Sequence, residues 1–160
     1  MKITKCHSTI TTNKNSEFDM SRTLLINPLS GDYIFGEIDA LSLGGIDTDR
    51  CSIHLFSGKH IGPNRGFGAN HIFAEHSKEM ARLGLYSLTD VPQYVCNIVQ
   101  TGTPLYFEGA SWRVTRVLAV KTSHGTAILE YIDRRDGAIW SVVTAFSTPR
   151  KHGIEVSQII

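Results

Sequence analysis

The chain of 160 residues contains 41% hydrophobic and 19% charged residues, which predicts one folded domain with a buried core and excludes disorder throughout. Its formal net charge of +1 excludes strong polyanion binding by the domain as a whole, so a nucleic acid would have to be held by a local patch. Three widely separated cysteines exclude a disulfide framework and a cysteine zinc cluster, and they favour a reducing compartment as the site of action.

Residues 1–50 are expected to form an extension ahead of a main domain at residues 51–160. The first twenty residues are polar and predict a tail or a loosely held arm. They lack the apolar core of a signal peptide, and no run of the sequence approaches the roughly 18 apolar residues of a membrane span. Between residues 24 and 46, short apolar runs alternate with Gly, Pro and Asp, which predicts short strands and turns.

Two helices are predicted in the middle of the chain. The first extends from about residue 69 to residue 83, with Gly84 as its stop signal. The second extends from about residue 90 to residue 100. Its apolar residues recur at the helical spacing of i, i+3, i+4, i+7 and i+8, and they are Val91, Tyr94, Val95, Ile98 and Val99.

Four strands are predicted after Gly102. Their sequences are LYFEG, SWRVTRVLAV, GTAILEYID and GAIWSVVTAFS, and Asp136-Gly137 is a hairpin signal between the last two. Two helices followed by a four-strand meander predict an α+β fold, in which the helices pack on one face of a four-stranded antiparallel sheet.

The stretch GFGANHIFAEH, residues 66–76, contains the candidate chemistry. Its glycines would let a ligand approach the backbone, and the N–H groups at a helix N-terminus favour an anion such as phosphate. His71 titrates near neutral pH and can move a proton in either direction, and Glu75, one turn later, could hold its tautomer. These features suit metal-free phosphodiester transfer. The alternative is that His71 is a surface or capping residue.

His76 lies five residues after His71, so a regular helix would point it elsewhere, in a stripe that we expect to be buried with Ile72, Met80 and Leu83. A metal site made from two histidines of one helix requires i, i+4 spacing, so this pair predicts no metal, and no cofactor is expected. His76 would either support the site from its buried side or act as a second proton-transfer group.

Further polar side chains are candidates for the same site. Arg65 in the preceding loop could reach a phosphate. Lys78 is expected on the same face of the helix as His71, the candidate base. Arg113 and Arg116 lie on opposite faces of one predicted strand, so at most one of them faces the cleft. Thr144 is either a β-branched filler or a placed hydroxyl. Alternation of the last strand puts it on one face with Trp140, Val142 and Phe146.

The run GPNRGFGANHIFAEHSKEMARLGLYSLTDVPQYV and the strand WSVVTA resemble a pattern in bacterial polymorphic toxins and phage-linked proteins, the BECR (barnase, EndoU, colicin and RelE-like) nucleases. The resemblance covers about residues 52–149. It implies helices against a four-stranded antiparallel sheet, and a metal-independent ribonuclease toxin neutralised by an immunity protein or antitoxin. By motif position, the catalytic residues would be His71, His76 and Thr144. The supporting basic residue would be Arg113 or Lys78.

The leading hypothesis is therefore a ribonuclease effector that cleaves RNA, such as tRNA, by 2′-hydroxyl transphosphorylation. It would act in a bacterial cytoplasm, in its own cell or in a target cell reached through a secretion system. The near-neutral charge departs from strongly basic ribonucleases. One alternative is a non-enzymatic module that binds a protein or a phage particle, and another is a transferase that uses a nucleotide cofactor in the same pocket.

Overall fold

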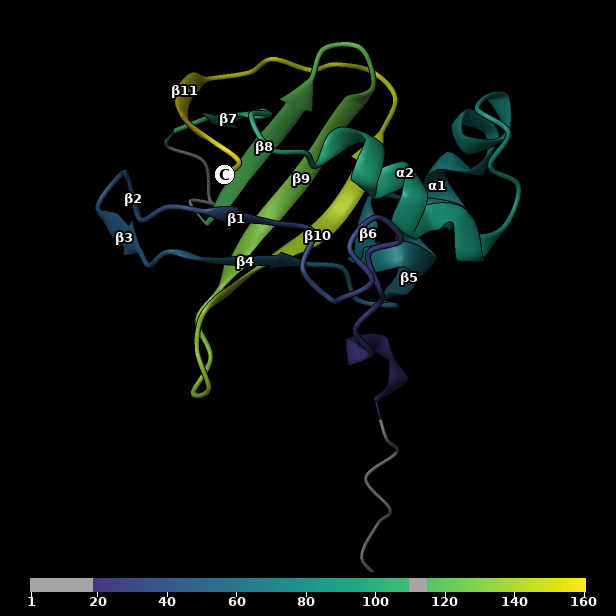
Figure 1. Ribbon diagram of the computed structural model, residues 1–160, viewed down its shortest axis with the longest axis horizontal. Helices are drawn as coiled ribbons and strands as arrows, with labels where there is room; N and C mark the ends of the chain where they lie inside the picture. Colours follow the sequence, from purple (N-terminus) through teal and green to yellow (C-terminus); the bar gives the residue numbers. More distant parts are fainter. Residues whose placement is uncertain (1–18, 110–114) are drawn as a thin grey trace, which may run out of the picture.

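A seven-stranded mixed sheet is the framework of the fold, as seen in the computed structural model, which describes residues 19–109 and 115–160 (Figure 1). In spatial order its strands are β1 (Gly36–Ile38), β4 (Cys51–His54), β10 (Ile139–Phe146), β9 (Gly125–Ile132), β8 (Arg116–Lys121), β7 (Pro104–Phe107) and β11 (Ile154–Gln158). Neighbouring strands are antiparallel except β4 and β10, which are parallel.

Two short hairpins and two helices complete the described part of the chain. The hairpins pair β2 (Leu41–Leu43) with β3 (Ile46–Thr48), and β5 (Lys59–Gly62) with β6 (Arg65–Phe67). The helices are α1 (Gly68–Arg82) and α2 (Val91–Ile98), and the 3₁₀ turns are η1 (Met20–Arg22) and η2 (Leu88–Asp90). Both helices and the β5–β6 hairpin lie together at one end of the molecule, with α1 packed against β10 (Figure 1).

The predicted four-stranded antiparallel sheet is wrong, although the fold is α+β. The four predicted strands correspond to β7 to β10, and these are antiparallel neighbours. The sheet continues at both edges, because β4 and β1 extend it beyond β10 and β11 pairs with β7. These additional strands have only three to five residues, and long-range pairing fixes their place in the sheet. The run SIHLF, residues 52–56, does indicate a strand in the sequence, and β4 overlaps it.

The two helices lie close to their predicted positions. All five residues of the predicted α2 stripe are buried, which confirms its helical periodicity. In the predicted α1 stripe Ile72 and Met80 are buried, but Leu83 is 54% exposed because the helix ends one residue before it. Within the described residues neither helix is long and apolar enough to cross a membrane.

The segment before residue 50 contains short strands and turns, as predicted, and one of them belongs to the main sheet. β1 pairs with β4, with Glu37 opposite Ser52. Further back, the Ser57 N–H donates to the Thr23 carbonyl at 2.8 Å, and the Gly58 N–H donates to the Ser21 carbonyl at 2.8 Å. Residues 19–38 therefore support the strand and loop that lead into the β5–β6 hairpin.

Substitution of Ile53 tests whether β4 is a core strand. Its side chain is 0% exposed, and its residue is paired with Trp140 across the parallel ladder. Ile53→Ala is expected to lower the free energy of unfolding by about 2–5 kcal/mol, because it removes buried methyl groups and leaves a cavity. Ile154→Ala, in an edge strand at 75% exposure, is the matched control. Urea unfolding measures both variants, and equal losses would contradict the assignment.

Candidate active site

A cavity of about 570 Å³ lies between α1, the β5–β6 hairpin and the strands β8 to β10. This volume is in the range of small-ligand sites. Four residues predicted from the sequence, His71, His76, Thr144 and Arg65, all line it. The structure therefore brings together the three predicted catalytic side chains and one predicted substrate-binding arginine.

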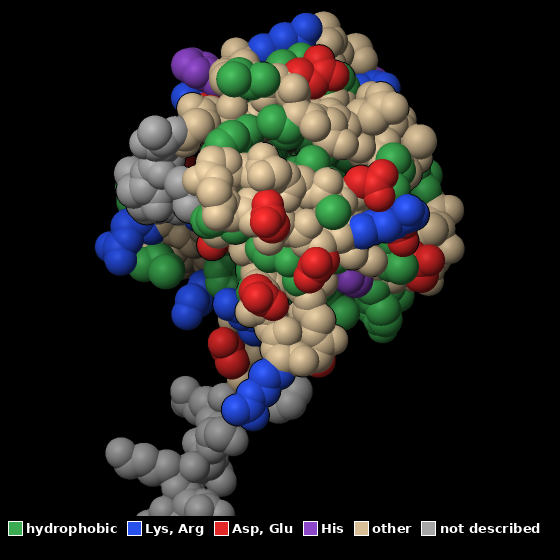
Figure 2. Space-filling view, turned by 90° about the vertical axis from the view of Figure 1, so that its left-hand side faces the viewer, with side chains coloured by type: hydrophobic (Ala, Val, Ile, Leu, Met, Phe, Trp, Pro, Cys, Tyr) green, Lys and Arg blue, Asp and Glu red, His purple; other side chains and the backbone are tan. Residues whose placement is uncertain are grey.

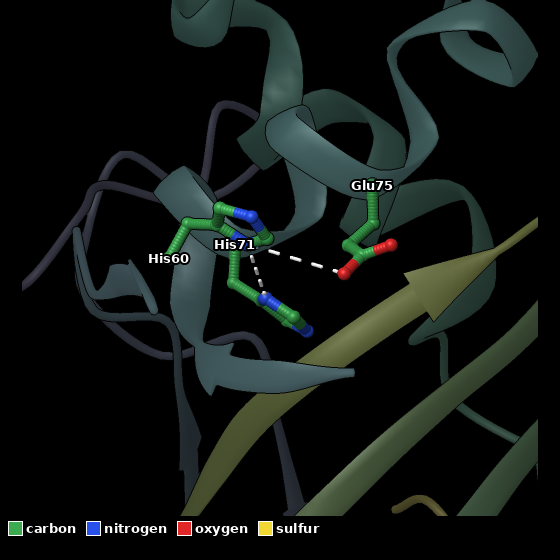
Figure 3. Close-up of side chains that lie close together, drawn as sticks. All are labelled: His60, His71 and Glu75. Carbon is green, nitrogen blue, oxygen red and sulfur yellow. Dashed lines mark hydrogen bonds and ion pairs between the residues drawn. The ribbon is translucent and has the colours of Figure 1, made fainter. Parts of the chain in front are cut away.

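His71 forms the inner wall of the cavity. It lies in the first turn of α1, and its side chain is largely buried, since the residue is 4% exposed. Its Nδ1 lies 3.1 Å from the Nδ1 of His60, and the two rings stack with centroids 5.3 Å apart (Figure 3). One nitrogen must donate and the other accept, so the pair shares one hydrogen. Beyond this contact, the His71 ring extends towards β10 (Figure 3).

The pKa of His71 is lowered from its ordinary value, first because burial disfavours the charged ring. The Glu75 carboxylate opposes this effect, whereas the neighbouring His60 and His76 add to the lowering. The shared hydrogen acts in the same direction, because two doubly protonated rings could not face each other at 3.1 Å. His71 is thus a neutral base at ordinary pH.

The glycines before α1 serve chain packing rather than ligand approach, which corrects the expectation from the sequence. A side chain at Gly66 would collide with the Lys59 carbonyl and would come within 2.8 Å of His71 Nδ1. The first helical N–H groups are also used within the protein, since Ala69 donates to the Phe56 carbonyl at 3.0 Å and Asn70 donates to the Ser57 carbonyl at 2.8 Å. An anion would therefore be held by side chains.

His76 faces the same cavity as His71, against the expectation from regular helical spacing. The backbone of α1 is non-helical at His76, with φ −127° and ψ 17°, and this kink turns the side chain towards β10. His76 Nδ1 lies 3.0 Å from Glu79 Oε2, and its ring centroid lies 5.9 Å from that of Phe146. Glu79 is itself fixed by the Tyr94 hydroxyl, which donates to it at 3.3 Å.

Thr144 reaches the cavity because of a β-bulge in β10. The pairing with β9 shifts register between Val142 and Thr144, so one extra residue changes the alternation of the strand. Before the bulge, Trp140 and Val142 belong to the hydrophobic core, and after it Ala145 does. Thr144 and Phe146 line the cavity, so the predicted common face of Thr144 with Trp140 and Val142 is wrong. The Thr144 hydroxyl is buried and has no hydrogen-bond partner in the described part of the chain.

Three arginines supply positive charge around the cavity: Arg65, Arg116 and Arg150. Arg116 forms a two-nitrogen pair with Glu130, with both nitrogens 2.9 Å from one carboxylate oxygen. Lys78 is exposed on α1 and is not among the lining residues, and Arg113 lies outside the described residues. Arg116, from the same predicted strand, lines the cavity.

The sequence offers Lys59-His60 only as a weaker phosphate contact than Arg65, whereas the structure makes His60 a direct neighbour of His71. A signal for it exists in KHIGPNRGF: Pro63-Asn64 is a turn pair, Asn64 has a positive φ of 56°, and the flanking strands pair His60 with Gly66. This hairpin sets His60 over the first turn of α1. Together with His71 and Glu75 it forms a group whose possible ligand atoms lie within 4.8 Å of one another, close enough to share a metal ion.

Comparison of the sequence with protein-family models and with curated proteins finds no match. The function of the site therefore has to be argued from its own geometry.

The lowered pKa of His71 predicts a stability change with pH. In the unfolded chain this histidine titrates near its ordinary value of 6.5, whereas in the folded protein it takes up a proton only at lower pH. As the pH falls through 6.5 the unfolded state takes up this proton before the folded state does, so the free energy of unfolding should fall as the pH is lowered from neutral through this range. His71→Asn should show a smaller fall, measured by urea unfolding at each pH.

The control is His124→Asn, the same substitution at an exposed histidine outside the cavity. His54, whose pKa is also lowered by burial, contributes equally in all three proteins. A His71→Asn protein with the wild-type slope would show that the His71 pKa is not lowered.

Proposed function

We propose that the protein is a metal-independent ribonuclease that cleaves RNA by 2′-hydroxyl transphosphorylation, with His71 as the general base. The observation behind this proposal is a buried imidazole of lowered pKa on the wall of a cavity that also holds His76, Thr144 and arginines. A neutral imidazole in such a position suits the removal of a proton from a ribose hydroxyl. The resemblance of residues 52–149 to nuclease toxins points to the same reaction.

In this mechanism, His71 takes the 2′ proton and the resulting oxygen attacks the adjacent phosphorus. The bond to the 5′ oxygen then breaks, and His76 donates the proton that this leaving oxygen needs. Glu79, 3.0 Å from His76 Nδ1, holds that ring so that its other nitrogen is left for the substrate. The products are a 2′,3′-cyclic phosphate and a free 5′ hydroxyl, and no water is consumed in this step.

Charge on the transferring phosphate would be stabilised by Arg116 and Thr144. Arg116 is already oriented by Glu130, so its guanidinium needs little reorganisation to meet an anion. The Thr144 hydroxyl lacks a protein partner, and rotation about its Cα–Cβ bond would exchange the positions of methyl and hydroxyl groups at the cavity wall. A hydroxyl that is free in the resting protein can be satisfied by the phosphoryl oxygen.

Substrate binding would depend on the local arginines because the molecule as a whole has almost no net charge. On the side away from the helices, acidic and basic side chains are interspersed over the described residues (Figure 2). Arg65 and Arg150 line the cavity and would meet the flanking phosphates. This arrangement favours a short RNA segment over extended non-specific binding.

The biological setting is part of the same proposal. A ribonuclease of this kind would act on cytoplasmic RNA of a bacterial cell, either its own or a target cell, and tRNA is the candidate substrate. The producing cell would then need an immunity protein or antitoxin, and the cavity mouth around Arg65 and Arg150 is where such a partner would block access.

His71→Ala is expected to reduce the rate of RNA cleavage by a factor of about 10² to 10⁴, because it removes the general base. The matched control is His124→Ala, at an exposed histidine outside the cavity. The measurements are the initial rate on total RNA and on tRNA, detection of the cyclic phosphate end, and growth after induced expression. EDTA should not lower the wild-type rate.

Two results would contradict the proposal. Loss of activity in EDTA would exclude the metal-independent mechanism. RNA left intact by the wild-type protein at every pH, with harmless expression, would favour the non-enzymatic binding module instead.

Substitutions at Thr144 test whether its hydroxyl takes part in catalysis or whether the side chain only fills space. Thr144→Val keeps the side-chain shape and removes a buried hydroxyl that has no protein partner, so stability should be unchanged or slightly higher. The cleavage rate should fall by roughly 10- to 1000-fold, and Thr144→Ser should retain most of it. Cleavage rates and urea unfolding on the same samples measure both effects. A fully active Thr144→Val protein would mean that Thr144 only fills space.

A further inference from the structure

We propose that His60, His71 and Glu75 form a Zn²⁺ site, and that zinc bound there inhibits the enzyme by occupying the general base. The inhibitory part rests on the proposed ribonuclease function, whereas the binding site rests on the geometry of the three side chains alone. Zinc would thus be a reversible inhibitor of a metal-independent reaction, and not a cofactor.

The three side chains come from two elements that are locked together. His71 and Glu75 lie one turn apart on α1, the i, i+4 spacing that places two ligands on one helix face. His60 comes from β5, and the pairing of His60 with Gly66 holds it over that face. Figure 3 shows the His60 ring in contact with both the His71 ring and the Glu75 carboxylate.

The distances are close to those of a tetrahedral zinc site. The two Nδ1 atoms are 3.1 Å apart, and ligand atoms in a tetrahedral site lie about 3.3 Å from each other, given zinc–nitrogen bonds of about 2.0–2.1 Å. His60 Nδ1 lies 4.0 Å from Glu75 Oε1, and the possible ligand atoms of all three residues lie within 4.8 Å of one another, so the carboxylate would have to move towards both imidazoles on binding zinc. His60 is exposed and Glu75 is only partly buried, which leaves room for this adjustment.

The ligand chemistry also suits zinc. Two imidazoles with one carboxylate are a common set for Zn²⁺, and the three protein ligands leave a fourth position open to the cavity. The carboxylate is already oriented, because the Asn64 N–H donates to Glu75 Oε1 at 2.8 Å. Such supporting hydrogen bonds fix the direction of metal ligands.

Zinc binding would change the protonation of His71. In the metal-free protein one of the two Nδ1 atoms carries the shared hydrogen. When both Nδ1 atoms bind zinc, each ring remains a neutral imidazole and carries its one hydrogen on Nε2, so the hydrogen that was shared between the two Nδ1 atoms is replaced by one on Nε2 of the same ring. His71 then has no free lone pair for the 2′ proton. The reaction stops without any change of fold.

The site is tested by titrating the full chain, freed of metal with EDTA and then freed of EDTA, with zinc chloride by calorimetry. Cobalt chloride, whose visible absorption reports tetrahedral nitrogen and oxygen ligands, provides a second probe. We expect one ion per chain. His60→Ala should weaken zinc binding by more than the roughly 10- to 100-fold effect typical of a lost supporting contact. His124→Ala should bind like the wild type.

The second arm measures RNA cleavage with increasing zinc, each protein normalised to its own rate in EDTA. The wild type should be inhibited over the concentration range in which calorimetry shows binding, and His60→Ala should be inhibited only at much higher zinc. If the wild type does not bind zinc, or if His60→Ala binds it equally well, the proposed site is wrong. If zinc makes RNA cleavage faster, the proposed inhibition is wrong. If the wild type fails to cleave RNA in EDTA, the proposed function falls, while calorimetry and cobalt spectra still decide the site.

Discussion

The short contact between His60 and His71 is the constraint on which the site depends. Two Nδ1 atoms at 3.1 Å can share only one hydrogen, and burial adds to the preference for a neutral His71. The ring is held on one side by His60 and extends on the other towards β10. This arrangement requires the β5–β6 hairpin to lie directly against α1, which a side chain at Gly66 would prevent.

Electrostatics in this protein is local. A chain with a net charge of +1 produces little long-range field, so attraction of an anion depends on the few arginines around the cavity. Arg116 is held by Glu130. The Glu75 carboxylate lies beside His60, and the Glu79 carboxylate lies beside His76. Glu75 is also the carboxylate of the proposed cation site, so the proposed catalysis and the proposed metal inhibition depend on the same group of side chains.

The site is formed where regular secondary structure is interrupted. The kink of α1 at His76 and the bulge of β10 before Thr144 each redirect one side chain that uniform periodicity would send elsewhere. Such local departures are common at functional sites, where the surrounding core holds a less favourable backbone in place. Here the core includes Ile72 and Met80 on α1, on either side of the kink, and Ala145 directly after the bulge.

The sequence by itself determined the α+β class, both helices and the antiparallel order of β7 to β10, because these depend on local periodicity. Residue chemistry also singled out His71, His76, Thr144 and Arg65, which line one cavity. Only the tertiary structure decided the width of the sheet, the neighbour of His71 and the place of Arg116 on the cavity wall. These depend on pairing between distant segments, such as the parallel contact of β4 with β10. The sequence of a strand as short as β4 does not indicate which strand it pairs with.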